Sequence, residues 1–163
     1  MSGEPGQKMA RRGWLRSGLL LVAATTLGAG LWALPFPRSF YGAFPFPGWD
    51  WISTLGPYNE HLVRDYGAMN LALGVLLVSA AISPERRLSQ VALLTYLAFA
   101  IPHFVFHAAQ THHFTFFHNA LQLGSLGLLV LLPVALLVLT TLSVAHSRVR
   151  PAERPEHKGG ITL

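Results

Sequence analysis

The sequence predicts an all-α protein, a polytopic membrane four-helix bundle with an aromatic-rich external loop. The first reason is composition, because 52% of the 163 residues are hydrophobic and 12% are charged, whereas soluble domains carry about 25% charged residues. The second reason is that the apolar residues gather in four long runs, and about 20 such residues suffice for a helix to cross a bilayer. We therefore expect one domain embedded in a membrane.

The four runs give the expected positions of the spanning helices, which are about residues 17–34, 62–82, 88–108 and 116–142. The first run follows basic residues, so a cleaved signal peptide is an alternative, although large residues such as Trp32 and Phe36 at its end fit cleavage poorly. The second run ends at Ser83 and Pro84, a typical stop signal. Pro102 lies in the third run and is expected to bend that helix, since proline lacks a backbone donor.

Lysine and arginine determine the expected orientation. Most of them lie in residues 1–15, in the loop between the second and third runs, and in residues 146–163, a tail that we expect to be disordered. Because cytoplasmic segments carry the excess of these cations, both termini are predicted to be cytoplasmic, in the cell (inner) membrane. The bilayer then explains the net charge of +5, and no nucleic-acid partner is expected.

The loop between the first two runs, residues 35–60, is rich in aromatic residues, proline and glycine. Proline and glycine prevent one continuous helix, and aromatic rings suit the membrane–water interface. We interpret the loop as an ordered cap on the outer helix ends, the alternative being an interfacial belt without a ligand role.

Most of the histidines map to the outer end of the bundle, as do several carboxylates. The polar residues that helical spacing places on common faces are His61 with Asp65, Tyr96 with His103 and His107, and His118 with Gln122. Polar groups at membrane depth avoid lipid, so the three polar stripes are expected to converge inside the bundle.

One hypothesis for this convergence is a site for a divalent transition metal or a haem. Imidazole and carboxylate groups suit such metals, and the chain has no cysteine for thiolate ligation. The predicted ligands are His61, Asp65, His103, His107 and His118. The alternative is that these histidines are hydrogen-bonded interfacial residues.

A second hypothesis is acid–base catalysis without a metal, as in an isomerase or cyclase of a terpene- or sterol-like substrate. The predicted catalytic residues are His61, Asp65, Tyr96 and His103. A carboxylate beside a histidine orients it and makes it more basic, and Arg64 would weaken the hypothesis by neutralising Asp65. Small residues that permit close helix approach or leave space for an apolar chamber are Gly67, Ala68, Gly74, Gly124, Ser125 and Gly127.

The stretch NEHLVRDYGAMNLALGVLL, residues 59–77, combines a polar start, an Arg-Asp pair, a glycine and a small-residue-rich span. It resembles the second helix of small four-helix bacterial membrane proteins of the DoxX-like and related uncharacterised families. The similar layout covers roughly residues 14–142. The resemblance implies a four-helix bundle without an agreed reaction, and it gives no role to the segment PHFVFHAAQTHHF.

Three classes of function therefore stay open. They are a binding or redox-accessory protein with an outward-facing histidine and carboxylate site, a membrane enzyme acting on a lipophilic small molecule, and a structural subunit with partners in a membrane complex. The sequence contains no phosphate-binding loop, serine nucleophile elbow or dinucleotide fingerprint.

Overall fold

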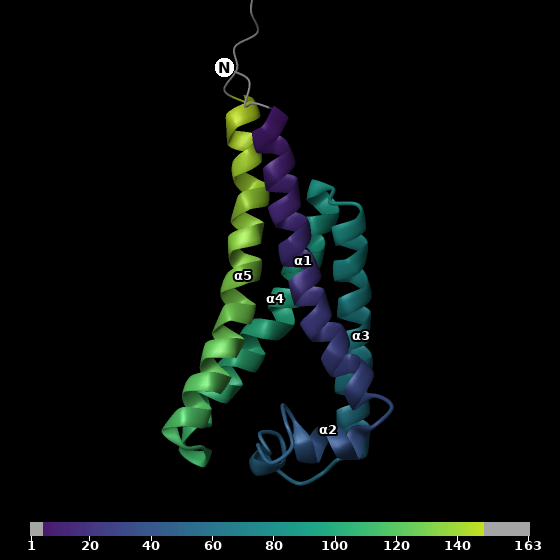
Figure 1. Ribbon diagram of the computed structural model, residues 1–163, viewed down its shortest axis with the longest axis vertical. Helices are drawn as coiled ribbons and strands as arrows, with labels where there is room; N and C mark the ends of the chain where they lie inside the picture. The colour runs from purple at the N-terminus through teal and green to yellow at the C-terminus, as the bar shows by residue number, and fades with distance from the viewer. Residues whose placement is uncertain (1–4, 149–163) are drawn as a thin grey trace, which may run out of the picture.

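A computed structural model describes residues 5–148, which form five α-helices and two short 3₁₀ helices (Figure 1). The long helices are α1 (Pro5–Ala33), α3 (Glu60–Ile82), α4 (Arg86–Ala109) and α5 (Phe116–Arg148). The short elements are α2 (Pro37–Ala43), η1 (Ser53–Leu55) and η2 (Thr111–His113). The four long helices are long and apolar enough to cross a membrane. The predicted all-α four-helix bundle is confirmed, and the chain is a multi-pass membrane protein.

Two helices are longer than the apolar runs that predicted them. α1 begins at Pro5 rather than at residue 17, and α5 continues to Arg148 rather than ending at residue 142. Arginine is a good helix former in water, so a helix need not end where the hydrocarbon core ends. Residues 146–148 of the predicted disordered tail are therefore helical, whereas residues 149–163 lie outside the described part of the chain. α4 continues as one helix through Pro102.

The long helices form two antiparallel pairs that meet at one end of the molecule and diverge at the other (Figure 1). α1 packs along α3, and α4 packs along α5. α1 and α5 meet near the start of α1, where the Arg11 guanidinium donates a hydrogen bond to the carbonyl of Leu139 at 2.5 Å. α2 and the loop after it lie across the gap between the diverging pairs. We call the end that carries α2 the capped end and the opposite end the basic end.

The α1–α3 pair is close because glycines lie at its crossing. A Cβ atom on Gly67 would lie 2.6 Å from the backbone nitrogen of Leu34, and one on Gly30 would lie 2.9 Å from the carbonyl oxygen of Gly67. Gly74 likewise faces the side chain of Leu27. Small residues let helix backbones approach. In contrast, Gly124 on α5 faces open space.

Two clusters of buried side chains hold the bundle together. The larger cluster joins all four long helices, and its members include Leu19, Leu77, Leu93 and Leu136. The smaller cluster lies under the cap, around the buried ring of Phe40. Side chains from both clusters border one cavity, so this cavity lies between the packed core and the cap.

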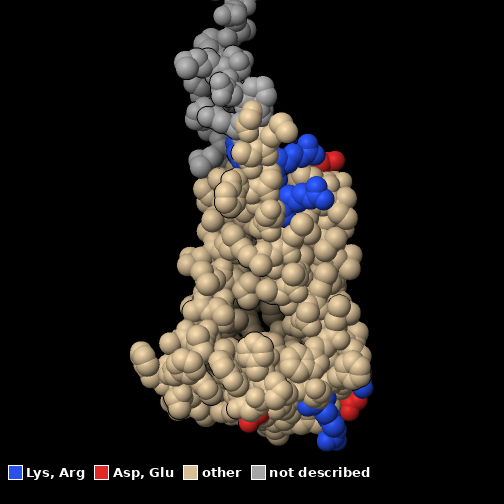
Figure 2. Space-filling view, viewed as in Figure 1, with Lys and Arg blue, Asp and Glu red and all other residues tan. Residues whose placement is uncertain are grey.

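Charged residues are confined to the two ends of the face that Figure 2 shows. Lysine and arginine gather at the basic end, charges of both signs lie at the capped end, and a wide uncharged band separates them. Large apolar side chains on the long helices are exposed, among them Leu21, Val75, Val91 and Leu128. Such a surface is suited to lipid rather than to water.

Candidate functional site

A cavity of about 900 Å³ lies in the capped half of the bundle. All four long helices and the cap contribute to its wall, which is largely apolar and aromatic. Among the described residues, no lysine, arginine, aspartate or glutamate lines it. Pockets for small molecules in proteins have volumes of about 300–1,000 Å³, so the cavity is large enough for a ligand.

The cavity opens sideways between α1 and α5. Figure 2 shows a dark hollow in the uncharged band, at the place where these two helices diverge in Figure 1. Exposed residues that line the cavity on this side are Thr25 and Gly28 on α1 and Leu121 and Ser125 on α5. Gly28 lies five residues before the end of α1, which is about 8 Å along the helix axis. The opening therefore lies within the apolar band.

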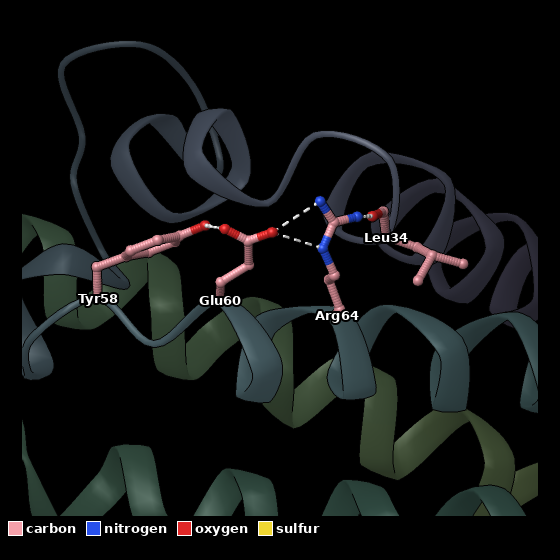
Figure 3. Close-up of polar contacts among 4 residues, drawn as sticks. All are labelled: Leu34, Tyr58, Glu60 and Arg64. Carbon is pink, nitrogen blue, oxygen red and sulfur yellow. Dashed lines mark hydrogen bonds and ion pairs between the residues drawn. The ribbon is translucent and has the colours of Figure 1, made fainter.

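Arg64 attaches the cap to α1 and α3 (Figure 3). Its Nη1 donates a hydrogen bond to the carbonyl of Leu34 at 2.5 Å, which satisfies an acceptor that the end of α1 leaves unpaired. Its Nε and Nη2 each lie 2.9 Å from Oε1 of Glu60, and the Tyr58 hydroxyl donates to Oε2 at 3.3 Å. The ion pair of Arg64 is thus with Glu60 and not with Asp65.

Tyr58 strengthens this attachment. Loss of solvent around its hydroxyl, together with the neighbouring Glu60 carboxylate, raises the pKa of Tyr58 above its ordinary value, so the hydroxyl remains a donor. The Arg38 guanidinium lies 4.9 Å from the centroid of the Tyr58 ring, within cation–π range. The Tyr41 hydroxyl adds a hydrogen bond of 2.5 Å to the carbonyl of Gly56. The loop is an ordered cap, as the sequence predicts.

The other side of the cap rests on α5 through aromatic contacts. The rings of Trp49 and His118 are stacked with centroids 5.3 Å apart, and Trp51 approaches His118 edge-on at 6.4 Å. Both tryptophans line the cavity. His118 therefore supports the cap from the outside of the cavity wall.

The structure divides the four residues predicted for acid–base catalysis. Tyr96 and His103 on α4 line the cavity. His61 and Asp65 do not line it, and they form a pair at 3.3 Å with side chains that are 88% and 61% exposed. Val63 lies on the buried face of α3. His61 and Asp65 are each two residues from Val63, which places them about 200° away from it around the helix axis. His61 and Asp65 therefore point away from the bundle.

The five residues predicted as metal ligands also fall in separate places. His103 and His107 are neighbours with ring centroids 4.7 Å apart, whereas His118 stacks on the cap and His61 pairs with Asp65. Within residues 5–148, no three His, Cys, Asp or Glu side chains lie close enough together to hold a metal ion. The geometry does not bring the five predicted ligands into one site.

Sequence reasoning placed Gln122 on a polar stripe with His118 but did not include it among the candidate ligands or catalytic residues, although it is the most unusual polar group of the cavity. Its side chain is 2% exposed, and neither its amide nitrogen nor its amide oxygen has a hydrogen-bond partner. Nδ1 of His107 and Nε1 of Trp51 are also buried without a partner. All three residues line the cavity. The available signal was one glutamine in an apolar run, because polar side chains at membrane depth often mark functional sites.

Comparison of the chain with protein-family models, with curated proteins and with solved structures finds no match.

Proposed function

We propose that this membrane protein binds a lipophilic molecule in the cavity and receives it sideways from the bilayer. The observation that carries the proposal is the opening of a largely apolar cavity of about 900 Å³ between α1 and α5, within the apolar band. A molecule dissolved in the hydrocarbon core reaches this opening without crossing water. The distribution of lysine and arginine favours an external position for the capped end, so the proposed source is the outer leaflet.

An occupant is also expected on energetic grounds. Side chains that border an empty space lose van der Waals contacts, and the cost rises with the volume of the cavity. Water is a poor occupant where the wall is apolar, because it needs several polar partners. A lipophilic molecule supplies the missing contacts along most of this wall.

A pair of substitutions on α5 tests the proposal. Ser125 lines the cavity beside its opening, so Ser125→Trp fills part of the space with a large ring. Leu128→Trp is the matched control, because Leu128 lies nearly one turn further along the same helix, is 68% exposed and does not line the cavity. The protein is purified in mild detergent and examined by native mass spectrometry, before and after addition of tetradecanol.

Wild type and Leu128→Trp should both hold a lipophilic molecule, either one retained from the membrane or the added tetradecanol. Ser125→Trp should bind tetradecanol roughly tenfold more weakly, which corresponds to about 1.4 kcal/mol. The proposal is wrong if wild type holds no such molecule, or if Ser125→Trp binds it as well as the control does.

A second candidate function is acid–base conversion of the bound molecule, because Tyr96 and His103 line the same cavity. The His103 ring stacks on Phe99 with centroids 5.1 Å apart, which restricts the orientation of the imidazole. A membrane lipid extract incubated with wild type and with His103→Gln tests this function. A product formed by wild type and absent with His103→Gln would support it, and identical lipid profiles would remove it.

A further inference from the structure

Two groups of polar side chains in the cavity wall differ in how their polar atoms are paired. In the first group, the polar atoms bond to carbonyls of their own helix. The Thr26 hydroxyl donates to the carbonyl of Val22 at 2.6 Å, and the Asn70 amide donates to the carbonyl of Tyr66 at 2.9 Å. Such local bonds satisfy these side chains without any ligand.

The second group consists of Trp51, His107 and Gln122, each of which has a buried polar atom without a partner. Their exposed fractions are 7%, 9% and 2%. Buried polar groups are almost always hydrogen-bonded in proteins, since leaving one unpaired is unfavourable. Three such residues in the wall of one cavity indicate a partner that comes from outside the chain.

These three residues lie around one region of the cavity. His107 is in the last turn of α4, and the Gln122 amide, near the start of α5, lies beside its imidazole. Trp51 contacts His118, which precedes Gln122 by one turn on α5. The three residues therefore lie where α4, α5 and the cap meet.

In the structure, none of these buried atoms lies in hydrogen-bond geometry with another. The indole can only donate and the amide oxygen can only accept. A hydroxyl group both donates and accepts, so it can bond to the amide oxygen of Gln122 and to the indole N–H of Trp51. A carbonyl oxygen only accepts, so it can bond to the N–H donors.

The matching group must also be uncharged. Along the described wall there is no lysine, arginine, aspartate or glutamate to serve as a counter-ion, and its histidines, His103 and His107, are neutral at the mildly alkaline pH of the test below. A phosphate, carboxylate or ammonium group buried there without a counter-ion would be strongly disfavoured.

We infer that Trp51, His107 and Gln122 form the recognition site for an uncharged hydroxyl or carbonyl group carried by a lipophilic molecule. Long-chain alcohols and isoprenoid alcohols have this chemistry. The inference rests on the proposed function, because the same cavity takes the apolar part of the molecule.

Three probes with the same chain length separate the polar group from the apolar part. They are tetradecanol, tetradecane and tetradecanoate, the last one ionised at mildly alkaline pH. Gln122→Met removes the amide and keeps the length of the side chain, and Gln90→Met is the matched control near the start of α4, outside the cavity. Binding to the full chain in detergent is measured by native mass spectrometry, with thermal unfolding as the check on folding.

Tetradecanol should bind Gln122→Met roughly tenfold more weakly than wild type, as expected for one lost hydrogen bond. Gln90→Met should bind it like wild type, tetradecane should bind all three proteins equally, and tetradecanoate should bind wild type more weakly than tetradecanol does. If Gln122→Met does not fold, Trp51→Phe removes the indole donor and should weaken tetradecanol binding in the same selective way.

Two results would overturn the inference. One is equal binding of tetradecanol to wild type and to the variant that folds, and the other is binding of tetradecanoate as tight as that of tetradecanol. In either case, the proposed cavity function would still be supported if Ser125→Trp weakens the binding of tetradecane. Failure of all three probes to bind wild type that retains no lipophilic molecule from the membrane would instead count against the proposed function itself.

Discussion

Substitution of Gly67 by alanine tests whether the capped half depends on the close approach of α1 and α3. The new Cβ atom would lie 2.6 Å from the nitrogen and 3.0 Å from the Cα of Leu34. Non-bonded atoms are in favourable contact at about 3.5–4.0 Å, so the two helices would have to separate by about 0.9 Å. Neither backbone atom can rotate away, and Arg64 is bonded to the carbonyl of the same Leu34.

The expected loss of stability follows from two opposing effects. Overpacking costs about 1–3 kcal/mol, and overlap with backbone places Gly67→Ala near the upper end of that range. Alanine recovers about 1 kcal/mol through its higher helix propensity. The net destabilisation is therefore about 2 kcal/mol, which lowers the melting temperature of a chain of this size by about 4–8 °C.

Thermal unfolding in detergent, followed by far-ultraviolet circular dichroism, measures this effect. Gly124→Ala is the control, because it gains the same helix propensity and its Cβ atom would meet nothing within 4 Å. The reasoning is refuted if Gly67→Ala melts at or above the temperature of Gly124→Ala.

Two further predictions concern the polar groups at the capped end. Arg64→Gln should destabilise the protein by about 1 kcal/mol, because it removes one bond to the carbonyl of Leu34 and an ion pair with Glu60 whose side chains are 43% and 51% exposed. Unchanged thermal unfolding would show that aromatic contacts alone hold the cap. Asp65→Asn should leave tetradecanol binding within roughly twofold of wild type, because Asp65 is 61% exposed and lies outside the cavity wall. A much larger loss in native mass spectrometry would bring Asp65 back into the site.

The four spanning helices were predictable because the bilayer sets both their length and their composition. The start of α1 and the end of α5 were not, because apolar runs show where the lipid-facing part of a helix ends and not where its backbone hydrogen bonding ends. α3 shows the favourable case, since both of its ends have local signals. Asn59 accepts a hydrogen bond from the backbone N–H of Leu62 at 3.1 Å and caps its start, and the helix ends before Ser83 and Pro84.

The candidate site was predictable only in part. Sequence spacing shows which residues share a helix face, but it does not show which face is turned inward. For α4, the face with Tyr96 and His103 borders the cavity. For α3, glycines that bring α1 close determine the inward face, so His61 and Asp65 point outward even though their spacing is equally regular. At the end of a helix these two side chains reach the aqueous interface, so the rule that polar groups avoid lipid does not force them inward.

The effect of Gln122→Met on stability distinguishes two roles of the Gln122 amide, because recognition of a ligand and a hydrogen bond within the fold predict changes of opposite sign. In protein freed of bound lipid, Gln122→Met removes a buried donor and acceptor that have no partner, and it should stabilise the fold by about 1–3 kcal/mol. Saturating tetradecanol should reduce or reverse this difference, because the protein that binds more tightly gains more from the ligand. Thermal unfolding with and without tetradecanol measures both effects, with Gln90→Met as the control. If the lipid-free Gln122→Met protein melts below wild type, the amide has a partner within the fold, and its assignment to a ligand is wrong.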